Sequence, residues 1–323
     1  MNTYIFIPDT NNKAGLGHFF RCLKYSDFII KPHKIIFLIK KNFDKKFLKK
    51  NNYNKIEIKY IFYENLKQTL IASKDKNKNI ITFLDSYNLK LQNLNFKIIS
   101  KKHINILDFK MNFKSDYTID HTFKRKIGYH KNKNSRFLLG IKYFPILNRL
   151  SFLKREIILI NFGSVKDKLL INQSLTFLRK LNLNEVYKIV IISTNSSQKD
   201  FANIKIKNRI FFYKFVSDIS KFYRRTFFSF GACGISLYEK CFYNIPSISK
   251  SLAKNQYFNF KNFNANGCIL EFDRVTKLNI KRIEEKQKFF NNIFKTEACI
   301  KKKFNYKKNK KNLNALFKKI NEN

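Results

Sequence analysis

Short apolar runs alternate with longer amphipathic segments along most of the chain. The runs have the length of buried strands, and the segments between them repeat apolar residues at helical spacing, for instance over His18–Ile30, Lys168–Leu181 and Ser236–Tyr243. This alternation predicts parallel sheets whose strands are joined by helices. The expected strands form two series: Tyr4–Ile7, Ile35–Ile39, Ile56–Phe62, Ile80–Leu84, Ile104–Leu107 and Tyr117–Ile119, then Ile157–Asn161, Val186–Ile192, Ile210–Tyr213, Phe227–Phe230, Ser247–Ser249 and Ile269–Phe272.

Two series of strands predict an α/β protein with two doubly wound, Rossmann-like domains. The expected division is an N-terminal domain over residues 1–148 and a C-terminal domain over 149–323, with the join near Pro145. Two such domains facing each other leave a cleft at the carboxyl ends of their strands, where ligands of this architecture bind. From Ile280 onward the pattern predicts a helix and a frayed tail rich in Lys and Asn, assigned to the second domain.

The charge of the chain is large, and composition changes what it indicates. Lys and Arg number 66 against 22 Asp and Glu, a net charge of 66 − 22 = +44. Hydrophobic residues at 44% exclude a disordered polycation. The Lys excess is spread through nearly every helical segment and accompanies many Asn, Ile and Phe, the residues of A/T-rich codons. We therefore interpret the charge as compositional drift and expect no specific nucleic-acid partner; a nucleic-acid-binding protein stays an alternative.

The spacing of the cysteines and the length of the apolar runs indicate the cellular compartment in which the protein is expected. The five cysteines contain no CxxC pair, which favours reduced thiols and argues against a disulfide scaffold or a zinc ribbon. Apolar runs stay far below the 18 residues of a membrane helix, and no signal peptide is recognised. We expect a cytoplasmic protein without a transmembrane segment, metal or cofactor, and the oligomeric state stays open, a monomer included. The cysteines are Cys22, Cys233, Cys241, Cys268 and Cys299.

Glycine is scarce, so the positions that keep it are informative. Only 8 of the 323 residues are Gly, and five of these follow a predicted strand and precede a predicted helix. At such points the backbone turns sharply and approaches bound phosphates closely, although a turn needs glycine for steric reasons too. The five are Gly15, Gly17, Gly163, Gly231 and Gly234.

The first glycine loop, Ala14–Arg21, follows strand Tyr4–Ile7 and opens a helix. Backbone N–H groups at a helix start bind anions. His18 stands at this start, where the positive end of the helix dipole disfavours imidazolium and leaves a neutral ring able to accept a proton. Arg21, one turn further on the same face, suits a carboxylate or a phosphate. The plain alternative is a histidine that only packs or caps the helix start.

Two further strand ends extend the expected site. Asp85, followed by Ser86 and Tyr87, ends the strand Ile80–Leu84 and is expected beside the first loop; its plain alternative is a cap for the next turn. Gly163 opens the second domain in the same topological place as the first loop opens the first domain.

The segment Gly231–Glu239 suits a nucleoside diphosphate. Backbone N–H groups near Gly234 and Ser236 would hold the phosphates, and the Glu239 carboxylate would accept both ribose hydroxyls. The segment misses the last glycine of a GxSxG elbow and no Walker A lysine follows it, which disfavours a serine hydrolase and a P-loop NTPase.

In this order, these motifs resemble a known family, the UDP-2,4-diacetamido-2,4,6-trideoxy-β-L-altropyranose hydrolases of pseudaminic acid biosynthesis. The similarity runs from about residue 3 to about residue 273. The first loop and the segment from Gly231 to Gln256 are its most specific parts. It is carried by the GxGHxxR loop (Gly15, Gly17, His18, Arg21), Asp85-Ser86-Tyr87, Gly140 with Tyr143, the Gly163 loop, Gly231–Glu239 with Pro246, and Asn255-Gln256.

The resemblance implies a glycosyltransferase-B-like fold and metal-independent hydrolysis of a UDP-sugar with inversion at the anomeric carbon, giving UDP and a free sugar for nonulosonic acid biosynthesis. It implies His18 as the general base that activates water, with Tyr87 and Asn255 near the sugar and phosphates. The absence of a DxD motif agrees with a reaction without a metal. The implied substrate-binding and UDP-binding residues are Gly15, Gly17, Arg21, Asp85, Gly163, Gly234, Ser236, Leu237, Glu239 and Gln256.

Three positions depart from the family pattern, and one enzymatic alternative stays open. Ser164 stands where many relatives carry a second glycine, Cys233 replaces a glycine, and Tyr238 stands at a usual Trp. These departures bear on substrate identity and rate more than on the fold. The alternative is a glycosyltransferase of the same fold, in which an acceptor hydroxyl replaces water.

Overall fold

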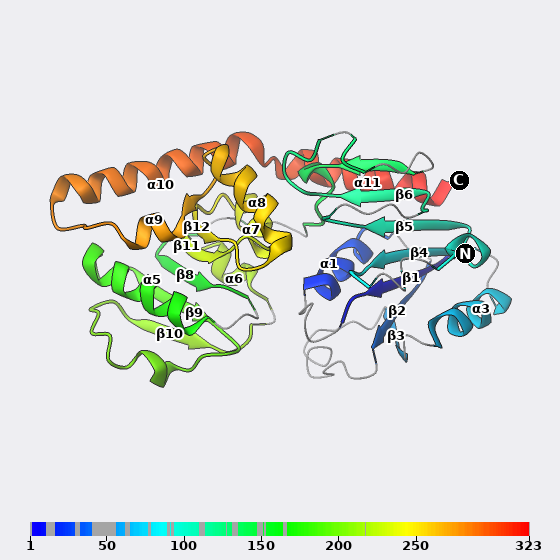
Figure 1. Ribbon diagram of the computed structural model, residues 1–323, viewed down its shortest axis with the longest axis horizontal. Helices are drawn as coiled ribbons and strands as arrows, with labels where there is room; N and C mark the ends of the chain where they lie inside the picture. Colours follow the sequence, from blue (N-terminus) through cyan, green and yellow to red (C-terminus); the bar gives the residue numbers. More distant parts are fainter. Residues whose placement is uncertain are drawn as a thin grey trace. The chain divides into compact units, whose positions relative to one another are not determined.

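The chain divides into two compact units, each built on its own parallel sheet (Figure 1). One unit comprises residues 1–147 with 307–323, and the other comprises 148–306. The computed structural model describes the chain outside residues 1, 11–16, 30–32, 41–55, 62–64, 77–78, 89–90, 92–93, 110–113, 127, 131–134, 147–150, 152, 164–166, 217 and 323.

The sheet of the first unit has seven parallel strands in the order β3-β2-β1-β4-β5-β6-β7. The edge strand β7 was not expected from the sequence, because its four residues are half-exposed and form no distinct apolar run. The strands are β1 (Thr3–Pro8), β2 (Lys34–Lys40), β3 (Ile56–Ile61), β4 (Ile80–Asp85), β5 (Lys102–Ile106), β6 (Tyr117–Asp120) and β7 (Arg136–Leu139).

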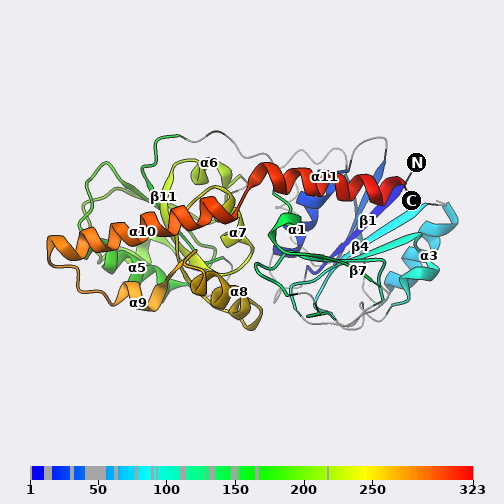
Figure 2. The ribbon, with the colours of Figure 1, turned by 90° about the horizontal axis from the view of Figure 1, so that it is seen from above.

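Alternate side chains of these strands enter two separate cores, as the period of a strand requires. Phe6 and Phe83 lie on the face covered by α1 (Gly17–Ser26) and α11 (Tyr306–Glu322), where the Phe83 and Phe317 rings stack at 5.7 Å. The opposite face packs against α3 (Leu66–Lys76). The view from above shows α11 on one side of this sheet and α3 toward the other (Figure 2). The described part of this unit also contains two short 3₁₀ helices, Phe96–Ile98 and Ile141–Tyr143.

The last helix corrects the expected division of the chain. The sequence placed residues 307–323 in the second domain as a tail, whereas the structure packs them as α11 on the first unit. Lys102 on β5 donates from Nζ to the carbonyl of Ile320 at 2.7 Å and so holds the end of α11. The physical reason is an apolar stripe at helical spacing among the lysines, formed by Leu313, Leu316, Phe317 and Ile320.

The second unit has a six-stranded parallel sheet in the order β10-β9-β8-β11-β12-β13. Its main core lies between the strands and the helices α5 (Lys168–Leu181), α9 (Phe272–Thr276) and α10 (Ile283–Lys303). The remaining elements are β8 (Ile157–Asn161), β9 (Lys188–Ile192), η4 (Gln198–Phe201), β10 (Ile210–Tyr213), α6 (Ser220–Tyr223), β11 (Thr226–Ala232), α7 (Ile235–Phe242), β12 (Ser247–Lys250), α8 (Lys254–Ala265) and β13 (Leu270–Glu271).

The cysteines differ in part from the expectation of free thiols. Cys268 and Cys299 form a disulfide that ties the segment before β13 to α10. The two residues are 31 apart in sequence, so spacing did not reveal the pair. Cys22, Cys233 and Cys241 are free and buried. Within the described part of the chain, no helix is long and apolar enough to cross a bilayer.

Candidate functional site

Each sheet has one point where the strand order reverses. In the first unit β1 lies between β2 and β4, and in the second unit β8 lies between β9 and β11. At such a switch point the loops leave the carboxyl ends of two neighbouring strands in opposite directions, which opens the place where α/β sheets bind ligands. Most of the candidate residues that the structure describes lie near these two points, and we describe each unit separately.

His18 and Asp85 meet at the switch point of the first sheet. Asp85 is the last residue of β4, opposite Pro8 of β1, and His18 is the second residue of α1. The His18 Nδ1 atom lies 2.5 Å from Asp85 Oδ1, and both side chains are buried. An ionised carboxylate only accepts, so Nδ1 carries a proton, and in the neutral form of the ring Nε2 then keeps the lone pair. Among the described residues, Nε2 has no hydrogen-bond partner.

Arg21 completes this buried group, in which it pairs with the Asp85 carboxylate. Its Nε donates to Asp85 Oδ2 at 2.6 Å, and its Nη2 donates to Oδ1. Burial raises the pKa of the Asp85 carboxyl, but Arg21 and His18 lower that pKa by more, so it stays well below its usual range. Arg21 and Asp85 are 1% and 0% exposed. Their opposite charges compensate each other inside the unit, and the pair holds His18 in place.

Asp108 and Tyr87 form a second pair beside the first. The Tyr87 hydroxyl donates to the Asp108 carboxylate at 2.9 Å, and Arg21 Nη1 lies 3.5 Å from the same carboxylate. The Tyr87 ring meets the His18 ring edge-on at 4.6 Å between centroids. Sequence reasoning missed Asp108, although it follows the strand run Ile104–Leu107 just as Asp85 follows its own strand. Tyr87 is thereby fixed next to the His18 imidazole.

Glycine geometry shapes the switch point of the second sheet. Gly163, two residues after β8, has φ +84°, a conformation that side chains rarely adopt. Gly231 lies opposite Asn161 in register, and a Cβ at Gly231 would stand 2.5 Å from the Asn161 carbonyl oxygen. Gly234 is the N-cap of α7 and supplies no side-chain cap, so the N–H groups of Ile235 and Ser236 have no partner within the helix. Loop and helix start together present backbone donors to an anion.

The other predicted residues of this unit have different surroundings. Ser236 is half-buried in the first turn. Leu237 is fully buried and its N–H donates to Gly234, so its side chain belongs to the core. Glu239 accepts a hydrogen bond from the Tyr223 hydroxyl at 3.0 Å. Asn255 is exposed near the start of α8.

Gln256 lies against the glycine segment. Its Nε2 stands 3.4 Å from where a Cβ of Gly234 would be, and its Oε1 accepts from the Leu252 N–H at 3.0 Å. The structure therefore places Gln256 beside the start of α7.

Two of the three departures from the family pattern have structural partners. Tyr238 donates to Asn259 Oδ1 at 2.6 Å and packs on Phe263 of α8. Cys233 is buried, and burial raises the pKa of its thiol to about 12, so the thiol is neutral. The third, Ser164, lies outside the described residues, as does Gly15.

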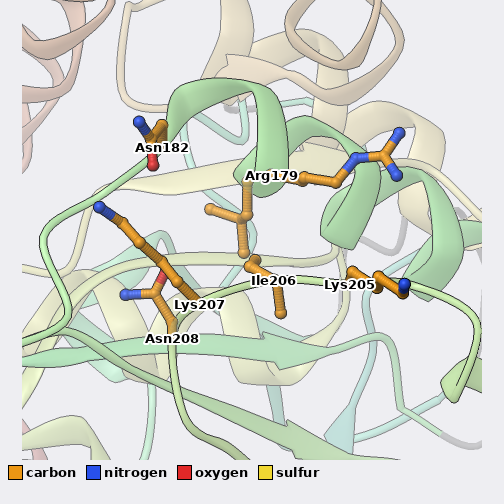
Figure 3. Close-up of a pocket in the computed structure, with 7 residues that line it drawn as sticks. Arg179, Asn182, Lys205, Ile206, Lys207 and Asn208 are labelled. Carbon is orange, nitrogen blue, oxygen red and sulfur yellow. The ribbon is translucent and has the colours of Figure 1, made fainter.

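A small pocket of about 210 Å³ lies elsewhere on the second unit, between the end of α5 and residues 205–208 (Figure 3). These segments precede β9 and β10, so the pocket is at the amino edge of the sheet. Its basic side chains do not converge, since Arg179 and Lys205 extend to one side and Lys207 to the other (Figure 3). We therefore do not assign the site to this pocket.

Comparisons with known proteins bear on the fold. No protein-family profile and no curated protein matches the chain by sequence. Solved structures match over nearly the whole chain: MurG of Acinetobacter baumannii superposes with a TM-score of 0.66 at 13% identity, covering 99% of this chain and 100% of MurG. The chain has the glycosyltransferase-B fold. The prediction of two doubly wound parallel-sheet domains is thereby confirmed.

Two further solved structures also match over nearly the whole chain. The glycosyltransferase of kitacinnamycin gives a TM-score of 0.68 at 10% identity over 98% of both chains. Arabidopsis thaliana UGT89C1 in complex with UDP-L-rhamnose gives 0.62 at 10% identity over 99% of both chains. At such identities the likeness concerns the fold, and the chemistry has to be argued from the residues.

Proposed function

We propose that the protein displaces UDP from a UDP-sugar, with His18 as the general base. The observation that carries this proposal is the Asp85–His18 pair at the first switch point, where a held Nδ1–H leaves Nε2 to take a proton. The glycine loops of the second unit supply backbone donors for the diphosphate. Support for the nucleotide comes from fold neighbours that are solved with UDP or UDP-L-rhamnose.

The residues suggest a single displacement. An attacking hydroxyl gives its proton to His18 Nε2 while its oxygen forms a bond to the sugar C1. The bond between C1 and the β-phosphate oxygen breaks, and UDP leaves with the electron pair. Asp85 stabilises the imidazolium that forms, and the donors at the start of α7 stabilise charge on the departing diphosphate. One displacement inverts the anomeric carbon.

Two nucleophiles fit this chemistry. Two structural neighbours are named as transferases, the kitacinnamycin glycosyltransferase and a spinosyn rhamnosyltransferase, which favours the hydroxyl of an acceptor molecule, and we place sugar transfer first. Water is the second candidate, favoured by the resemblance of the His18 loop and of the Gly231–Gln256 segment to the pseudaminic acid pathway hydrolases. For both nucleophiles we expect Tyr87 near the sugar, because it lies against the His18 ring.

The test is UDP release from a panel of UDP-sugars, followed by NMR with the anomeric configuration of the product. Release only when an acceptor alcohol is present supports transfer, and release in its absence to a free sugar supports hydrolysis. We expect His18→Asn to bind UDP like the wild type and to lose turnover by at least about a hundredfold. Full turnover in His18→Asn would remove His18 from the mechanism, and no release from any UDP-sugar would overturn the proposed function.

A further inference from the structure

Lys240 is a fully buried lysine without a partner at the switch point of the second sheet. Its side chain is 0% exposed, and among the described residues its Nζ has no hydrogen-bond acceptor. A buried ammonium without a counter-charge is strongly unfavourable. Such a group therefore indicates a partner that the protein chain alone does not provide.

The position of Nζ points to the glycine loop. A Cβ at Gly231 would lie 2.5 Å from Lys240 Nζ and equally close to the Asn161 carbonyl oxygen, so Nζ lies over Gly231 where β8 and β11 end. A helical side chain leans toward the N-terminus of its helix, which takes the Lys240 amine back under the Gly231–Gly234 loop. Because Gly231 has no side chain, the Lys240 amine fits in the space that a Cβ would take.

The groups facing Lys240 do not neutralise it. Burial lowers the pKa of the Lys240 amine to about 8, and the neighbouring thiols of Cys233 and Cys241 oppose this only weakly. Burial raises the pKa of both thiols, so they stay uncharged at neutral pH. The nearby carboxylate, Glu239, accepts instead from Tyr223. Below pH 8 an uncompensated positive charge therefore lies beneath the loop.

We propose that Lys240 binds the diphosphate of a nucleoside diphosphate from beneath the Gly231–Gly234 loop, together with the backbone N–H groups at the start of α7. This role rests on the proposed function. The phosphate oxygens supply the counter-charge that the buried amine lacks, and the amine adds a charge-assisted hydrogen bond to an otherwise neutral set of donors. Lys240 is thus a binding residue of the diphosphate, additional to those predicted from the sequence.

The proposal predicts a protonation signature. UDP binding raises the pKa of Lys240, so above pH 8 the protein takes up a proton when it binds UDP, and UDP affinity falls about tenfold per pH unit. Isothermal titration calorimetry of the wild type in buffers of different ionisation enthalpy measures this uptake. Lys240→Met, which keeps the length without the charge, is expected to bind UDP about tenfold or more weakly at pH 7 and to lose both the uptake and the pH dependence.

Lys102→Met is the matched control. Lys102 is also a buried lysine, but its amine donates to the end of α11, so its loss lowers stability and leaves UDP affinity unchanged. If Lys240→Met binds UDP with the affinity and pH profile of the wild type, the role of Lys240 is overturned while the proposed function stands. If the wild type itself does not bind UDP, the proposed function fails first.

Discussion

At the scale of single residues, Asp85 determines whether His18 can act as a base. Asp85→Asn removes the charge that stabilises the imidazolium and presents an amide where Nδ1–H needs an acceptor. We expect kcat to fall at least about a hundredfold while UDP affinity stays near the wild-type value, because the diphosphate donors belong to the other unit. Steady-state kinetics measure kcat, and calorimetry measures UDP affinity. An unchanged kcat in Asp85→Asn would contradict the role given to the Asp85–His18 hydrogen bond.

Lys240 also predicts how stability depends on pH. Its pKa is about 8 in the folded chain against 10.5 for an ordinary lysine, so between these values the unfolded chain binds more protons. The free energy of unfolding therefore rises as pH increases from 8 to 10.5, by up to about 3 kcal/mol. Lys240→Met removes this contribution and is more stable than the wild type at pH 7, while Lys24, whose pKa burial also lowers to about 8, contributes equally in both proteins. Urea unfolding of both proteins at pH 7 and 10 measures this change in the free energy of unfolding. The same change with pH in the wild type and in Lys240→Met would contradict the prediction.

At the scale of elements, the strand pattern was readable because parallel strands buried on both faces are continuous apolar runs. The runs at Tyr4–Ile7 and Ile157–Asn161 became β1 and β8 with nearly the predicted bounds. The position of Asp85 beside the loop that leads to His18 was also expected, since Asp85 ends β4 and this loop follows β1, which the topology makes its neighbour. Such features follow from local pattern and strand order.

Other features depend on contacts between distant residues, and local pattern does not contain them. Asp108 joins the site only through Arg21 and Tyr87, which come from other elements. The lysine-rich sequence of α11 resembles a solvated tail until its four apolar residues meet the first sheet. Lys240 looks like one more surface lysine in a chain with 66 Lys and Arg.

Two glycines of the second switch point are expected to respond differently to alanine. Gly163→Ala places a side chain at φ +84° in open space, at a cost of about 1–2 kcal/mol. Gly231→Ala drives a Cβ against the Asn161 carbonyl and the Lys240 amine, so β8 and β11 must separate. We expect the larger loss of stability, and the larger loss of UDP affinity, in Gly231→Ala. Equal losses in urea unfolding and in UDP titration would contradict the packing described for Gly231.

At the scale of the whole molecule, a charge of +44 and a nucleotide site make different predictions about salt. Contacts between dispersed lysines and nucleic acid release counterions, so such binding weakens steeply with salt, roughly a thousandfold or more between 50 and 200 mM when six or more phosphates are contacted. A UDP held by backbone donors and one buried lysine depends on salt far less. We expect calorimetry to show UDP binding at 200 mM KCl, where RNA binding has disappeared. Sub-micromolar RNA affinity at that salt would favour the nucleic-acid alternative.

The last prediction follows from the way the chain is divided between its two units, of which one is contiguous in sequence and the other is not. Residues 148–306 form one contiguous unit with its own core and its disulfide, so this segment expressed alone is expected to unfold cooperatively. The other unit is discontinuous. Without α11, residues 1–147 leave Phe28, Phe83 and Tyr25 without the helix whose Phe317 packs on all three.

Residues 1–147 alone should therefore form a loose state that binds a hydrophobic dye, and adding 307–323 through a flexible linker should restore a cooperative transition. Phe317→Ala in the linked fragment is expected to cost about 3–5 kcal/mol, while exposed Lys318→Ala costs little. A cooperative transition of 1–147 alone, equal to that of the linked fragment, would show that α11 adds nothing to the first core. It would also mean that the apolar stripe of α11 serves another purpose than closing that core.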